Sequence, residues 1–92
     1  MPADLSATLP PHGFAGPVKR SITIAGHETS VSLEPVFWTA LEAAARALEL
    51  PLSALVGAID AARVDQREPP NLASALRSWL FANATENRSQ QR

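Results

Sequence analysis

One stretch of the sequence, residues 29–56, most constrains what this chain can fold into. Residues 29–33 alternate polar and apolar side chains, which is the period of a β-strand with one buried face. After Pro35, apolar side chains recur at the spacing of one helix face, at Phe37, Leu41, Ala44 and Leu48. Pro51 interrupts this helix, and a second apolar series follows at Leu52, Leu55, Val56 and Ile59. Because a lone strand leaves its backbone groups unpaired, this pattern predicts that a partner chain completes the core.

A further strand is predicted just before this one. Residues 18–24 alternate in the same way, with Ile22 and Ile24 on one face. Residues 25–28 turn the chain, and Gly26 among them can adopt a positive φ. The two strands are therefore expected to pair as a hairpin, and two hairpins would give a four-stranded sheet in a homodimer.

Three helices are predicted after the hairpin. The first covers residues 35–48 and begins with a proline, which suits the first helical position. The second runs from residue 51 or 52 to residue 64 and contains Gly57, which close packing against another backbone would explain. The third follows Asn71 as its cap and carries an apolar stripe formed by Leu72, Leu76, Trp79 and Leu80. The predicted fold class is α+β.

These periodicities separate a core from a surface. The side chains predicted to be buried are Val31, Leu33, Phe37, Leu41, Leu55 and Ile59. Ser30 and Ser32 fall on the opposite face of their strand and are predicted to be exposed. Trp38 and Trp79 lie at or beside the apolar stripes, so both are interpreted as packing residues.

Several blocks of the chain, taken in order, resemble a known family. Residues 30–38 and 52–56 resemble the ribbon-helix-helix family of DNA-binding proteins. Residues 19–27 are similar to a bacterial subfamily with an extra strand before the ribbon strand, and residues 71–77 are similar to its C-terminal helix. The resemblance covers residues 18–82. It implies an intertwined homodimer that inserts a two-stranded β-ribbon into the major groove of double-stranded DNA.

The resemblance assigns base contacts to the exposed face of the second strand, at Ser30 and Ser32. Glu28 on the same face is a further candidate, although it departs from the family because phosphates repel a carboxylate. Hydroxyl groups can donate to or accept from several bases, and a carboxylate can accept from cytosine N4. The alternative from the residues alone is that the serines simply keep an exposed strand hydrated.

Contacts to DNA phosphates are expected from Lys19, Arg20, Arg46 and Ser53. Lys19 and Arg20 precede the first strand, where long cationic side chains could reach the flanking backbone, although a solvated pair at a strand edge is equally common. Ser53 lies at the N-terminus of the second helix, whose free amides and dipole favour an anion. The chain departs from the family here, because Glu49 and Pro51 occupy a bend that commonly carries glycine and a small polar residue.

Composition excludes several classes of protein. The chain of 92 residues has room for one small domain, and without cysteine it has neither disulfides nor a thiolate metal site. His12 and His27 lie far from any carboxylate pair at metal-ligand spacing, so no metal and no cofactor are predicted. No apolar run approaches the length of a membrane span and no signal peptide opens the chain, so a cytoplasmic, soluble protein is expected.

No enzymatic activity is predicted. The serines lack a histidine base in any recognisable arrangement, and there is no glycine-rich phosphate loop. The domain is predicted over residues 18–83, between a mostly disordered arm at residues 1–17 and a flexible tail at residues 84–92.

The predicted function is therefore a homodimeric transcriptional regulator that reads DNA with a β-ribbon. The formal charge of −1 weighs against this, because nucleic-acid binders usually present a basic face. The alternative is a protein-interaction module, with another protein as its partner, that has kept the dimer fold and lost DNA binding.

Overall fold

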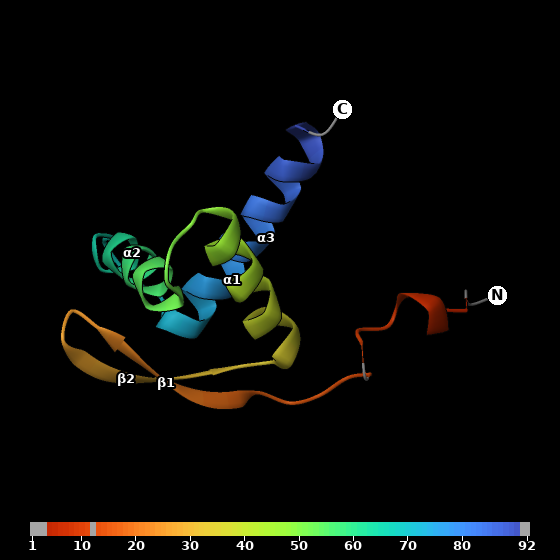
Figure 1. Ribbon diagram of the computed structural model, residues 1–92, viewed down its shortest axis with the longest axis horizontal. Coiled ribbons are helices and arrows are strands. Elements are labelled where there is room, and N and C mark those ends of the chain that lie inside the picture. The colour runs from red at the N-terminus through yellow and green to blue at the C-terminus, as the bar shows by residue number, and fades with distance from the viewer. Residues whose placement is uncertain (1–3, 12, 91–92) are drawn as a thin grey trace.

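Two antiparallel strands and three helices form the ordered architecture of the computed structural model, which describes residues 4–11 and 13–90. The elements are a 3₁₀ turn η1 (Ser6–Thr8), strands β1 (Val18–Ile24) and β2 (His27–Leu33), and helices α1 (Pro35–Ala47), α2 (Leu52–Val64) and α3 (Leu72–Gln90). Figure 1 shows the hairpin along one side of the three helices, with the N-terminal arm extending away from them. His12 lies outside the described residues, as do parts of the predicted arm and tail, residues 1–3 and 91–92.

The hairpin turns more tightly than predicted. Its loop contains only Ala25 and Gly26, at φ values of 51° and 81°, and β2 starts at His27 instead of Thr29. Two positive φ values in a two-residue loop define a type I′ turn, whose twist matches that of the strands. Pairing therefore continues up to the turn itself, with Ile24 opposite His27.

The register of the hairpin leaves one edge of β2 open. The turn places Ile24 and His27 in a hydrogen-bonded pair, and in an antiparallel ladder such pairs recur at every second residue. The backbone groups of Glu28, Ser30 and Ser32 therefore point away from β1. The sheet built by the described residues has two strands, so none of them pairs with this edge.

The core lies between the inner face of the hairpin and the helices. Buried side chains come from every strand and helix of this unit: Ile22, Val31, Leu33, Trp38, Leu41, Ala45, Leu55, Val56, Ile59, Leu76 and Leu80. Leu33, Leu41 and Val56 are fully buried within the single chain. Within the chain, α3 packs against β2, α1 and α2 and covers these side chains. The partner chain stays a prediction.

The buried face of α1 differs from the predicted one by one position. Trp38 is 4% exposed, whereas Phe37, expected in the core, is only half-buried and Leu48 is 53% exposed. The indole of Trp38 packs against β1 and donates its Nε1–H to the carbonyl oxygen of Val18 at 2.9 Å. This contact rotates α1 so that Trp38 takes the inward position.

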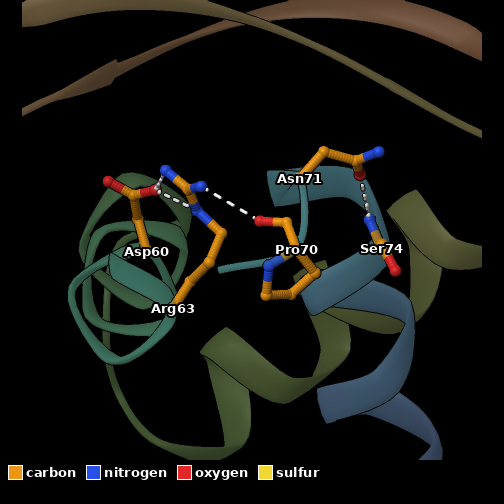
Figure 2. A network of polar contacts seen from close by, with 5 residues as sticks. All are labelled: Asp60, Arg63, Pro70, Asn71 and Ser74. Carbon is orange, nitrogen blue, oxygen red and sulfur yellow. Dashed lines mark hydrogen bonds and ion pairs between the residues drawn. The ribbon is translucent and has the colours of Figure 1, made fainter. Parts of the chain in front are cut away.

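A polar network fixes the start of α3 relative to α2 (Figure 2). The Nε and Nη2 atoms of Arg63 lie 2.9 and 2.8 Å from Oδ1 of Asp60, and Nη1 donates to the carbonyl oxygen of Pro70 at 3.0 Å. The side-chain oxygen of Asn71 accepts from the amide of Ser74 at 2.8 Å, which confirms the predicted N-cap. The connection is therefore tied to both helices.

Gly57 does not owe its place in α2 to close packing among the described residues. A Cβ atom built there would meet the Cγ2 atom of Ile24 at 3.8 Å, which is ordinary van der Waals contact. Packing of Gly57 against the backbone of a second copy stays a prediction.

The third helix is longer than the predicted one. Its backbone remains helical to Gln90, through residues for which the sequence predicts a flexible tail. Residues 81–90 contain neither glycine nor proline, so nothing in their composition ends the helix. Figure 1 shows this half of α3 projecting away from the hairpin. Within the described chain, none of the helices has the length and apolarity needed to cross a membrane.

Candidate nucleic-acid interface

Six exposed side chains share the face of the hairpin that points away from the helices, here called the outer face. They are Lys19, Ser21, Thr23, Glu28, Ser30 and Ser32. Strand alternation explains the set, since the intervening residues Ile22 and Val31 are buried. The outer face is therefore the polar half of a hairpin whose other half belongs to the core.

The six residues form three cross-strand pairs. Lys19 lies opposite Ser32, Ser21 opposite Ser30, and Thr23 opposite Glu28. The two charges consequently sit at opposite ends of the face, with Glu28 next to the turn and hydroxyl side chains between them. Short hydroxyl groups can both donate and accept hydrogen bonds, which suits contact with base edges or phosphate oxygens.

Four of the predicted site residues meet on this face, namely Lys19, Glu28, Ser30 and Ser32. Ser21 and Thr23 lie on this face as well and are absent from the predicted set. The signal was present, because residues 18–24 alternate in the same way as the second strand and a hairpin brings both polar series to one face.

Arg20 does not join Lys19 on the outer face. Its guanidinium carbon lies 4.6 Å from the centroid of the Trp38 ring, and its Nη2 atom lies 3.6 Å from Oε2 of Glu42. Consecutive residues of a strand point to opposite faces, so the two cations could not both reach the same surface. The structure separates the pair that sequence analysis had grouped together.

The other predicted phosphate contacts lie at the bend between α1 and α2. Arg46 is exposed in the last turn of α1, and Ser53 is exposed in the first turn of α2. Two backbone hydrogen bonds close the end of α1. The amide of Leu50 donates to the carbonyl oxygen of Ala45 at 2.9 Å, and the amide of Glu49 donates to that of Arg46 at 3.0 Å. These bonds form a Schellman motif, which requires the left-handed conformation that Glu49 adopts at φ 57°.

The N-terminus of α2 carries no side-chain cap. Pro51 stands at the cap position and its carbonyl oxygen accepts from the amides of Ala54 and Leu55 at 3.0 and 3.2 Å. The first amides of the helix, at Leu52 and Ser53, are left without an intrahelical partner, as at every helix start. Their partial positive charge favours an anion, whereas the carboxylate of nearby Glu49 opposes one.

An ion pair joins α3 to the end of the hairpin. Glu34, between β2 and α1, accepts from Nε of Arg77 at 3.2 Å. A hydrogen bond from its own backbone lowers the pKa of Glu34, burial acts in the opposite direction, and Arg77 lowers it further by hydrogen bonding and charge. The carboxylate form is therefore the one that holds α3 next to β2.

No group of three or more histidine, cysteine, aspartate or glutamate side chains that could hold a metal ion occurs among the described residues. The chemistry available on the outer face is accordingly that of hydroxyl, ammonium and carboxylate groups.

Comparison with known proteins gives one match. Residues 17–84 match the family model described as a ribbon-helix-helix domain, a span that contains both strands, α1, α2 and most of α3. Neither the curated proteins nor the solved structures contain a match to the chain. The matched span includes every residue of the outer face and of the bend.

Proposed function

Because this chain belongs to the ribbon-helix-helix family, we propose that it binds double-stranded DNA through the outer face of its hairpin and regulates transcription. The family consists of non-enzymatic DNA-binding proteins that typically dimerise. We propose neither an enzymatic activity nor a cofactor for this member. We propose a bacterial, cytoplasmic protein, as implied by the subfamily that residues 19–27 resemble.

The observation that carries the proposal is the composition of the outer face. A surface strand reads base edges through polar side chains that are exposed and able to reach into the groove. Ser30 and Ser32 meet these requirements on β2, and Glu28 can accept from cytosine N4. We assign base contacts to these three residues.

Dimerisation is proposed through the open edge of β2. Backbone groups of Glu28, Ser30 and Ser32 point to this edge, and a second copy can satisfy them by adding its own β2 in antiparallel orientation. The resulting sheet has four strands in the order β1, β2, β2 of the partner, β1 of the partner. Both copies of Ser30 and Ser32 then lie in its two central strands.

Phosphate contacts are proposed for Lys19, Arg46 and Ser53. Lys19 supplies a cation beside the base-contacting serines, since it lies opposite Ser32. Arg46 and Ser53 flank the bend, where the free amides of α2 favour an anion. Arg20 is left out of this set because it packs against Trp38 on the inner face.

A protein-interaction module is the second candidate. The formal charge of −1 and the carboxylates of Glu28 and Glu49 weaken the attraction to phosphates. An apolar groove of about 450 Å³ lies between α1 and α3, lined by Ala40, Ala43, Ala44, Ala47, Leu48, Leu80, Asn83 and Ala84. This groove is available to a protein partner whether or not the protein binds DNA.

Fluorescence anisotropy with duplexes from the region upstream of the protein's own coding sequence tests the proposal. Wild type is expected to bind with an affinity that falls as salt rises. Ser30→Ala is expected to reduce discrimination between duplexes by about 1 kcal/mol, the low end for a base contact. Ser78→Ala, an exposed serine on α3, is the matched control.

Two results would count against DNA binding by the outer face. Absence of salt-dependent binding by wild type at low ionic strength would favour the interaction module. If wild type binds DNA and Ser30→Ala behaves like Ser78→Ala, then β2 does not read the bases, although DNA binding itself stands.

A further inference from the structure

The pairing of β1 with β2 sets the width of the surface that would face DNA. Neighbouring strands lie about 4.7–4.9 Å apart, so the outermost strand axes of the proposed four-stranded sheet are separated by roughly 14 Å. The major groove of B-form DNA is about 12 Å wide and admits a two-stranded ribbon. The two central strands can therefore enter the groove, whereas the two copies of β1 meet its walls.

We propose that β1 is a phosphate-contacting strand, in which Lys19 and Ser21 bind backbone phosphates on each side of the groove while β2 occupies it. This inference rests on the proposed function. It assigns a ligand to Ser21, which sequence analysis did not single out, and gives the extra strand a role of its own in binding.

The chemistry of the two residues fits phosphate. Lys19 is exposed, and its ammonium forms no ion pair within the described part of the chain. The hydroxyl of Ser21 is exposed and can donate to a phosphate oxygen. Thr23 is excluded from the site because it lies opposite Glu28, whose carboxylate repels phosphate.

The cross-strand register places the proposed phosphate contacts of β1 beside proposed base contacts of β2. Ser21 is directly opposite Ser30, and Lys19 is directly opposite Ser32. Side chains opposite each other in an antiparallel pair have Cβ atoms about 4.5–5.5 Å apart. Ser30 and Ser32 therefore each have a proposed phosphate contact as their nearest neighbour on β1, whereas Glu28 lies opposite Thr23.

Arg20 is a positioning residue in this arrangement. It stacks on Trp38 and pairs with Glu42, both on α1, so it fastens β1 to the helix from the inner face. The same helix holds Val18 through the indole of Trp38. Lys19 lies between these two attachment points, which fixes its backbone relative to β2.

Salt dependence measured by fluorescence anisotropy tests the proposal, with the same upstream duplexes and full-length protein. Lys19→Ala is expected to reduce the slope of log affinity against log salt by about 2 per dimer, since two phosphate contacts are lost. Arg67→Ala, which removes an exposed cation from the connection between α2 and α3, is expected to leave the slope nearly unchanged. Adding Arg20→Gln to Lys19→Ala is expected to leave the slope at the value for Lys19→Ala.

Base preference provides the second measurement. Ser21→Ala is expected to weaken binding to all duplexes by the same factor, whereas Ser30→Ala changes the ranking of duplexes. Both residues are exposed, and unchanged circular dichroism of the variants establishes that they fold.

Three results would overturn the inference while the proposed function stands. The first is a change of base preference in Ser21→Ala, which would put β1 inside the groove. The second is an equal loss of slope in Lys19→Ala and Arg67→Ala, and the third is a further loss in the double variant. If wild type binds no DNA, the proposed function fails first and the inference fails with it.

Discussion

The indole Nε1 of Trp38 donates a hydrogen bond of 2.9 Å to the carbonyl oxygen of Val18, so the first residue of β1 is tied to the second turn of α1. Arg20 strengthens the attachment by stacking on the same ring at 4.6 Å. The hairpin is thereby fixed to the helices at the end opposite its turn. This contact, together with those of α2 with β1 and of α3 with β2, sets the orientation of the outer face.

Trp38→Phe is expected to lower the free energy of unfolding by roughly 1 kcal/mol, because the carbonyl of Val18 loses its donor while most apolar contact is retained. Urea unfolding followed by circular dichroism measures the change. Trp79→Phe is the control, since Trp79 is half-buried and no hydrogen bond from its indole is found in the described chain. Equal effects of both variants would show that the hydrogen bond contributes nothing.

Leu76→Ala is expected to cost about 2–5 kcal/mol of unfolding free energy, because this side chain of α3 is fully buried. Ser78→Ala on the same helix is exposed and is expected to change little. Chemical denaturation gives both values. A change near zero in Leu76→Ala would mean that α3 does not close the core in solution.

The oligomeric state is expected to respond to proline at only one of the two edges of the hairpin. Ser30→Pro removes an N–H at the open edge of β2, which the proposed partner strand needs, and is expected to shift the protein from dimer to monomer. Ser21→Pro makes the same change on the outer edge of β1 and is expected to leave a dimer. Light scattering distinguishes 9.8 kDa from twice that mass. Monomeric wild type, or loss of the dimer in both variants, would contradict the proposed interface.

Two substitutions of Glu49 separate backbone strain from charge. Glu49→Gly relieves the positive φ and is expected to stabilise the fold by about 0.5–1 kcal/mol, the difference between the left-handed penalty and the entropy of glycine. Glu49→Gln keeps the strain and is expected to give no such gain. Both remove a negative charge near α2 and are expected to tighten DNA binding equally at low salt. Unequal binding would show that the carboxylate is not what weakens the anion site.

Acid is expected to loosen the attachment of α3. Since the pKa of Glu34 is lowered from its ordinary value of 4.5, its contribution is complete above that value and is lost as the pH falls through the lowered pKa. Glu34→Gln is therefore expected to be less stable than wild type at neutral pH and to lose less stability on acidification. Urea unfolding between roughly pH 7 and pH 3 measures this. Glu68→Gln, an exposed carboxylate, is expected to follow wild type.

The elements themselves could be predicted because their signals are local. Alternation in residues 18–24 gives β1, and the prolines at positions 35 and 51 mark the starts of α1 and α2. Asn71 acts as a cap through a bond to a residue three positions away. Such information is contained within one turn or one strand of the sequence.

Two features of the structure could not be predicted from the sequence, because they depend on contacts that periodicity does not specify. Phe37 and Trp38 are adjacent large apolar residues, and only the distant carbonyl of Val18 decides which of them faces inward. The apolar stripe of α3 could equally cover its own core or that of a partner, and the sequence pattern is the same in both cases. The separation of Arg20 from Lys19 could have been predicted, since strand alternation alone places the two side chains on opposite faces.

The two-residue turn at Ala25 and Gly26 has a consequence for how this protein can change over evolutionary time. An inserted residue that is not accommodated by a longer loop or a bulge would shift the register of β1 against β2 by one and bring Ser21 to the core side and Ile22 to the surface. Substitutions at the outer positions carry no such penalty, because those side chains contribute nothing to the core. Variation in what the hairpin recognises can therefore accumulate by point substitution, while the length of its turn stays constant.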